Sequence, residues 1–169
     1  HPGPGANWND DKCGPVGGTT HLGVGKVTVW GNDPKGHKDQ AWKICYEVET
    51  DGPGVFIRTH PTSQYVWADQ TKHPEPVVQQ SVKVFDKKTR KVVKTIQVTE
   101  EEGKAAVHME FNADGSEVWV SVWNRKDNKN PTGEIVIYDA KTLEEKTRIK
   151  GLTTPTGKFN VHNRVNHVT

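Results

Sequence analysis

Short apolar runs that alternate with polar residues recur along this chain, and the clearest of them spans residues 117–123. Its sequence, Glu-Val-Trp-Val-Ser-Val-Trp, alternates as an extended strand does and is rich in β-branched and aromatic residues. A shorter apolar run at residues 107–111 precedes it, and residues 112–115 (Asn-Ala-Asp-Gly) form a turn between the two. This arrangement predicts a β-hairpin.

Two further strands complete the unit. The run Ile-Val-Ile-Tyr at residues 135–138 is followed by a polar turn at residues 139–142 and by an alternating segment that ends at Ile149. None of these segments has the 3.6-residue period of a helix. The pattern therefore predicts four consecutive strands.

The same unit occurs upstream. Trp67 lies 52 positions before Trp119, and Phe85 lies 53 before Tyr138. The strands expected in this copy are residues 55–60, 65–67, 81–86 and 91–96. A partial copy covers residues 27–30 and 41–48 but shows no recognisable opening run, and residues 158–163 resemble an extra opening run. Four strands in a period of about 50 residues are typical of a β-propeller.

The sequence therefore predicts an all-β fold, a β-propeller fragment of about three four-stranded blades. The expected units are residues 1–53, 54–105 and 106–155, with a closing strand at 156–165. A closed propeller needs about four to eight blades, so we expect either missing blades of a larger ring or self-association. Otherwise the side faces of the end blades would be large exposed apolar patches. The absence of an initiator Met leads us to expect a piece of a longer protein.

Composition excludes several classes of function. A net charge of +2 over 169 residues gives no electrostatic reason to expect nucleic acid as a partner. No stretch approaches the ~20 apolar residues that span a bilayer, so we expect no membrane partner. Cys13 and Cys45 lack the Cys-x-x-Cys-His spacing, which excludes covalent c-type haem and a thiolate zinc site on these two residues. Whether they form a disulfide stays open.

The candidate chemical residues are histidines and an N-terminal loop. Residues 1–7 are rich in Gly and Pro, so their backbone could approach a ligand closely or simply form a turn. Three of the four histidines His21, His60, His108 and His162 lie at or near opening runs, which in a propeller are nearest the axis. Without a fixed ligand spacing, ordinary polar contacts are expected for them, and we predict no metal site. There is no nucleophile motif or phosphate loop, so a reaction would require a cofactor.

Several segments together resemble the C-terminal part of the respiratory nitrite reductases of the cytochrome cd type. The resemblance is collinear from His1 to about Asn163. It rests on residues 1–7 (His-Pro-Gly-Pro-Gly-Ala-Asn), 14–16, 20–23, 56–61, 80–86, 117–124 and 154–161. It implies an eight-bladed parent propeller with a d-type haem on its axis, a periplasmic location, and electron transfer to nitrite in denitrification, which yields nitric oxide.

The resemblance also implies roles for individual residues. His1 corresponds to one of two distal histidines that give protons to iron-bound nitrite, with Gly3 beside it against the macrocycle. Phe56 corresponds to a residue that packs on the ring, and His108 lies near the haem edge. Thr156, Gly157 and Phe159 correspond to the C-terminal loop that lines the haem pocket. The iron ligand and the other distal histidine are expected upstream, outside this chain.

Two positions depart from the reductase pattern, and they keep other functions open. His108 replaces a Gln, and Pro4 replaces a basic residue. A haem-carrying or haem-maturing propeller without nitrite turnover could share the same fold. A fragment that only makes protein contacts is a third reading, and the isolated chain is expected to be inactive by itself.

Overall fold

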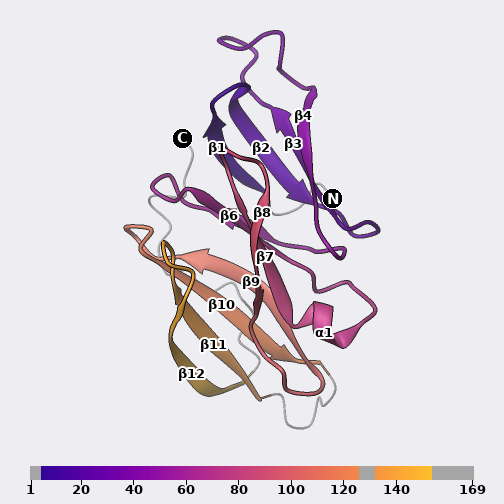
Figure 1. The fold of residues 1–169 in the computed structure, drawn as a ribbon, viewed down its shortest axis with the longest axis vertical. Helices are drawn as coiled ribbons and strands as arrows, with labels where there is room; N and C mark the ends of the chain where they lie inside the picture. The colour runs from indigo at the N-terminus through magenta and orange to yellow at the C-terminus, as the bar shows by residue number, and fades with distance from the viewer. Residues whose placement is uncertain (1–4, 126–131, 154–169) are drawn as a thin grey trace.

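The computed structural model describes residues 5–125 and 132–153 and contains three four-stranded antiparallel sheets. Figure 1 shows the sheets stacked along the long axis of the molecule in chain order. Within each sheet the strands are adjacent in sequence order, so each sheet is a simple meander. The predicted fold class, a propeller fragment with three four-stranded blades, is confirmed.

The first sheet contains β1 (Ala6–Asp10), β2 (Gly14–Thr20), β3 (Lys26–Gly31) and β4 (Ile44–Glu49). The second contains β5 (Ile57–Thr59), β6 (Tyr65–Asp69), β7 (Ser81–Asp86) and β8 (Val92–Gln97), and the short helix α1 (Pro76–Gln79) lies between β6 and β7. The third contains β9 (Lys104–Phe111), β10 (Glu117–Asn124), β11 (Thr132–Asp139) and β12 (Glu145–Thr153).

The first sheet corrects one expectation, because its opening strands are present. β1 and β2 supply them, but their sequences contain few large apolar residues. In β1, buried Ala6 and Trp8 alternate with exposed Asn7 and Asn9. In β2, glycine is required for space: a Cβ on Gly18 would lie 2.5 Å from the Trp8 ring. Hydrophobic pattern alone could not reveal a strand whose side chains are mostly small or polar.

The outer face of the first sheet carries both polar and apolar residues. Asn7, Thr19, Thr28 and Glu47 lie on it, as their cross-strand pairing shows. Trp30 and its cross-strand partner Ile44, which is 65% exposed, are large apolar residues of this face, and a Cβ on Gly17 would lie 2.6 Å from the Trp30 ring.

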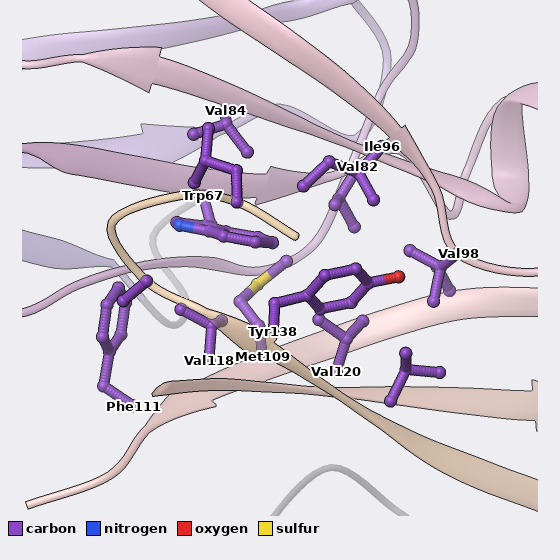
Figure 2. Close-up of a cluster of buried hydrophobic side chains, with 14 of the residues drawn as sticks. Trp67, Val82, Val84, Ile96, Val98, Met109, Phe111, Val118, Val120 and Tyr138 are labelled. Atoms are coloured by element: carbon purple, nitrogen blue, oxygen red, sulfur yellow. The ribbon is translucent and has the colours of Figure 1, made fainter. Parts of the chain in front are cut away.

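Two apolar clusters hold the three sheets together, and the middle sheet contributes to both. On β6, Val66 and Ala68 pack toward the first sheet, whereas Trp67 packs toward the third. Figure 2 shows Trp67, Val82 and Val84 pointing into the same space as Met109, Val118 and Tyr138 of the third sheet. Since successive side chains of a strand point to opposite faces, a strand covered on both faces buries its side chains at consecutive positions. The run 81–86 is buried at its first five positions, and its two buried polar side chains are hydrogen-bonded: Ser81 Oγ accepts from Gln70 Nε2 and Lys83 Nζ donates to Thr95 Oγ1.

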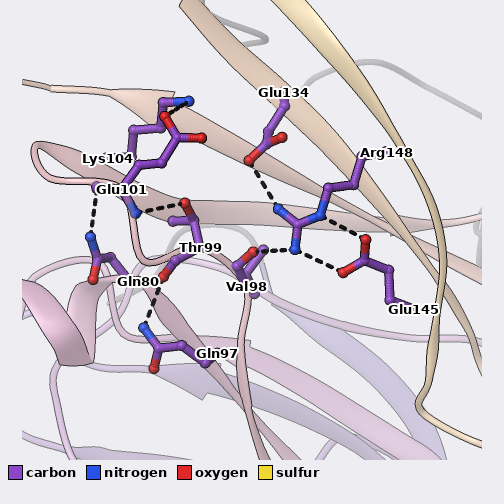
Figure 3. A network of polar contacts seen from close by, with 9 residues as sticks. All are labelled: Gln80, Gln97, Val98, Thr99, Glu101, Lys104, Glu134, Glu145 and Arg148. Atoms are coloured by element: carbon purple, nitrogen blue, oxygen red, sulfur yellow. Dashed lines mark hydrogen bonds and ion pairs between the residues drawn. The ribbon is translucent and has the colours of Figure 1, made fainter.

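Polar contacts join the outer strands of neighbouring sheets. The Arg148 guanidinium donates to the Val98 carbonyl oxygen at 2.9 Å and to buried Glu134 at 3.0 Å (Figure 3). It also pairs with Glu145, at 2.6 Å from Nε to Oε1. A charged group that is shared between two carboxylates and a carbonyl offsets the cost of burying Glu134.

A disulfide joins Cys13 and Cys45, which the sequence left open. It links the β1–β2 turn to the outermost strand β4, with the two Cα atoms 6.4 Å apart. The Arg90 guanidinium of the second sheet lies beside it, 2.6 Å from Asp10 and 4.3 Å from the centre of the Tyr46 ring. The first sheet is thus closed covalently and attached to the second through Arg90. Within the described residues, no helix is long and apolar enough to cross a membrane.

Candidate functional site

The candidate site lies on the innermost strands, where two of the residues singled out from the sequence come together. The opening strand β5 contacts both β1 and β9. Phe56 immediately precedes β5, and His108 lies within β9. Their ring centroids are 4.4 Å apart with an interplanar angle of 78°, an edge-on contact. Edge-to-face packing is a favoured arrangement of aromatic rings.

His108 owes its position to an irregularity in β9. The pairing of β9 with β10 shifts between Val120 and Ser121, so that Met109 and Val107 are paired but His108 is an extra residue. Its φ angle is 62°, in the left-handed region, and the residue is 2% exposed. Bulges of this kind redirect a side chain and are frequent at functional sites. The bulge explains why His108 turns toward Phe56 and not along the regular sheet.

A buried carboxylate lies behind this aromatic pair. Asp69, at the end of β6, accepts hydrogen bonds from the Val55, Phe56 and His108 N–H groups. Burial raises the pKa of Asp69 to about 6, and these hydrogen bonds oppose the rise. Desolvation is the larger effect because the side chain is fully enclosed.

An ion pair lies next to His108 on the same strands. Arg58 Nε is 2.9 Å from Glu110 Oε1, and Arg58 Nη2 is 3.3 Å from His108 Nε2. Arg58 also donates to the Ile57 carbonyl at 2.9 Å and to the Gly5 carbonyl at 3.4 Å. Burial raises the pKa of Glu110, and Arg58 opposes the rise. The guanidinium thus connects the starts of β1 and β5 with the C-terminal half of β9.

Sequence reasoning missed Arg58, Glu110 and Asp69. A signal for the first two was present, because they are 52 positions apart, the same spacing as Trp67 and Trp119. Both also lie two positions after a predicted site residue, on the same face of an opening strand. For Asp69 the sequence carries no such signal, because its partners are backbone groups.

The other sequence-based expectations divide into two groups. His1, Gly3, Thr156, Gly157, Phe159 and His162 lie outside the described residues, so their roles stay predictions. His21 and His60 do not converge with His108. His21 Nε2 lies 2.7 Å from Thr28 Oγ1 on the outer face of the first sheet, and His60, beyond the far end of β5, lies 2.8 Å from Thr62 Oγ1. These two histidines make ordinary polar contacts, as expected.

The residues of the site fit a haem better than a bare metal ion. A haem presents a flat apolar macrocycle with carboxylate substituents, which aromatic rings and a guanidinium can accommodate. Phe56 is half-buried, and the Arg58 side chain keeps 22% of its surface exposed. Among the described residues, the one cluster of metal-type ligands is Asp10 with the two disulfide-bonded cysteines, whose sulfurs are not free thiolates.

The fold and the site thus define a segment of a β-propeller with an aromatic and charged cluster on its inner strands. Comparison with known proteins is consistent with this class. The family model of the cytochrome D1 heme domain matches residues 1–164, and the chain belongs to that family. The family expected from the sequence is confirmed, and its cofactor is the d-type haem that was expected.

Two relatives of this chain have different named activities. The chain is 39% identical over 184 residues to a nitrite reductase of Stutzerimonas stutzeri, a match that covers 99% of this chain and 32% of the relative. It is 37% identical over 131 residues to the dihydro-heme d1 dehydrogenase of Pseudomonas aeruginosa, covering 76% of this chain and 24% of the relative. The chain therefore spans a third or less of the length of these relatives.

The solved structure of the dihydro-heme d1 dehydrogenase NirN is similar to this fold. It superposes with a TM-score of 0.71 at 32% identity and covers 89% of this chain and 28% of the solved one. The structural and sequence comparisons thus agree on the family, while the named activities within it differ.

Proposed function

We propose that this chain is the C-terminal part of the d-type-haem propeller of a periplasmic nitrite reductase, which reduces nitrite to nitric oxide. The observation that carries the proposal is the 39% identity to a nitrite reductase over 99% of the chain. The cluster of Phe56, His108 and Arg58 supports it, because it offers a ring-packing surface and a cation on adjacent inner strands. The upstream blades would complete the ring; without them, the isolated chain is expected to self-associate.

The reaction assigns tasks to residues of this chain. Nitrite takes up one electron and two protons and yields nitric oxide and water. A bound d-type haem would supply the electron, and its iron ligand would come from outside this chain. His1 would donate a proton, because imidazole titrates near pH 6.5. Gly3, Thr156, Gly157 and Phe159 would line the macrocycle together with Phe56, and His108 would lie at its edge.

A second function of the same family is favoured by one residue. The resemblance to the reductases implies Gln where this chain has His108, and both a curated relative and the similar solved structure are dihydro-heme d1 dehydrogenases. On this alternative the parent carries or matures the d-type haem and does not turn over nitrite. Arg58 and Phe56 would serve either function, because both require the haem to be held.

Two measurements separate these functions. Titrating the chain with d-type haem should give a specific shifted absorption band; no band would favour a propeller that only makes protein contacts. Nitric oxide formation from nitrite and a reductant, measured on the haem-loaded parent, selects the reductase. There His1→Ala should slow turnover by roughly 10²–10⁴-fold, as expected for a lost proton donor, and haem retention should change little.

The matched control is His37→Ala, which removes an exposed histidine that pairs with Asp33 in the β3–β4 loop. Turnover at the parent rate in His1→Ala would show that the assignment of His1 is wrong. Loss of the haem in that variant would instead assign His1 to ligation or loop packing.

A further inference from the structure

Asp69 is the most enclosed acidic residue near the candidate site. It ends β6, is 1% exposed, and points toward the third sheet, as Trp67 does two positions earlier. Its own main chain is also tightly approached, since a Cβ on Gly54 would lie 2.1 Å from the Asp69 carbonyl oxygen. A carboxylate in such a place must have its oxygen atoms bound by donors.

The two carboxylate oxygens bind two different segments, the residues just before β5 and the strand β9. Oδ1 accepts from the Val55 N–H at 2.7 Å and the Phe56 N–H at 3.2 Å, and Oδ2 accepts from the His108 N–H at 3.3 Å. The Asp69 N–H in turn donates to the Phe56 carbonyl at 3.1 Å. The backbone of Phe56 is therefore held on both sides by one residue.

The hydrogen bond from the His108 N–H to Asp69 Oδ2 stabilises an unfavourable backbone conformation of His108. His108 is a non-glycine residue at φ 62°, and it is the extra residue of the bulge, so its N–H is outside the regular ladder of β9 and β10. A buried N–H that is released from a sheet needs another acceptor. Asp69 Oδ2 is that acceptor.

We infer that Asp69 is the positioning residue of the cofactor site, because its single carboxylate sets the places of Phe56 and His108 relative to each other. This inference rests on the proposed function for its cofactor, but the hydrogen bonds that carry it belong to this chain alone. Asp69 acts through the backbone of the two ring-bearing residues and does not itself have to touch the haem.

The third sheet has a residue, Ser121, that corresponds in position to Asp69 of the second sheet. Ser121 follows Asp69 by 52 residues, the repeat distance, and lies two positions after Trp119 as Asp69 lies two after Trp67. It is fully buried, and within the described part of the chain its hydroxyl has no hydrogen-bond partner. The carboxylate is thus a specific feature of the second sheet and no requirement of the blade fold.

Hydrogen exchange read by mass spectrometry tests the positioning directly. In Asp69→Asn the amide can keep one oxygen for Val55 and Phe56, but it then directs an NH₂ group toward the His108 N–H. In Asp69→Ser, which copies Ser121, the acceptor is too short to reach both strands. We expect exchange to rise by about tenfold or more in segments 54–57 and 105–109, and by less than about twofold in β3 and β11. Ser121→Ala, the matched control, should change neither segment.

A titration with d-type haem links the positioning to the cofactor. Both Asp69 variants should shift the absorption band of the bound haem or weaken its affinity by about tenfold, whereas Ser121→Ala should bind as the parent chain does. A uniform rise in exchange across all strands would overturn the inference and make Asp69 a purely structural residue. So would a local rise with an unchanged band and affinity. If the unmodified chain binds no haem, the proposed function fails, and the exchange pattern alone decides whether Asp69 positions the pair.

Discussion

The rings of His108 and Phe56 meet edge to face, with the two centroids 4.4 Å apart, although the residues are 52 positions apart in the sequence. The contact joins the inner strands of two neighbouring blades. It therefore reports both on the packing of the blades and on the geometry of the candidate haem site.

We expect His108→Gln to fold and to retain the bulge. The Gln amide can donate a hydrogen bond at a similar reach, but it lacks the aromatic edge, so the free energy of unfolding should fall by about 0.5–1.5 kcal/mol. Urea denaturation of His108→Gln, Phe56→Leu and the double variant measures the contact as a coupling energy. If the two losses simply add, the rings contribute no specific interaction. In the haem-loaded parent, His108→Gln should give the pocket of the reductases.

Removing Arg58 should destabilise the folded chain more than removing Glu110, its ion-pair partner. Arg58→Met leaves Glu110 half-buried without its cation, so the pKa of Glu110 should rise further and stability should fall by about 1–3 kcal/mol. Glu110→Gln should cost less, because an amide can still accept from the guanidinium. Lys146→Met, which breaks the more exposed pair with Glu117, is the control and should cost less than about 1 kcal/mol. Equal losses in both pairs would contradict the assignment.

Asp69 should make the free energy of unfolding of the chain depend on pH between about pH 4 and pH 7. Its pKa is raised from 3.8 to about 6 in the folded chain, so the folded state binds the proton more tightly than the unfolded state. The stabilisation is complete below pH 4 and is lost as the pH rises through 6. Between pH 7 and pH 5, the unfolding free energy of the parent chain should rise by about 1 kcal/mol relative to Asp69→Asn. Parallel stability curves for the two proteins would show that Asp69 does not titrate in this range.

Reduction of the Cys13–Cys45 disulfide should destabilise the first sheet. The bond closes a loop across 32 positions, for which the loss of stability is about 2–4 kcal/mol. Denaturation of the parent chain with and without reductant should reveal this difference. The double variant Cys13→Ala/Cys45→Ala should resemble the reduced protein and be insensitive to reductant. A parent chain that is equally stable in both conditions would show that the bond contributes nothing to folding.

The sequence by itself determined the strands whose burial gives a recognisable pattern of apolar and polar residues. β10 has a clear alternation, and β7 carries Val82, Val84 and Phe85 because it is covered on both faces. The repeat distance of 52–53 residues then predicted the blades. β1 escaped this reasoning, because its exposed face carries Asn7 and Asn9 and its neighbour β2 needs glycine where Trp8 and Trp30 pack.

Only the tertiary structure decided which polar residues belong to the site. Arg58 and Glu110 meet across two blades, and the carboxylate of Asp69 binds backbone N–H groups, which every residue except proline possesses. The only sequence signal of the first relationship is the repeat distance of 52 residues, and the second has none. The sequence likewise did not predict the disulfide between Cys13 and Cys45, because it forms only where the fold places β4 close to the β1–β2 turn. Local pattern records which face of a strand is buried, whereas a hydrogen bond or a disulfide depends on distances that only the packing of the sheets sets.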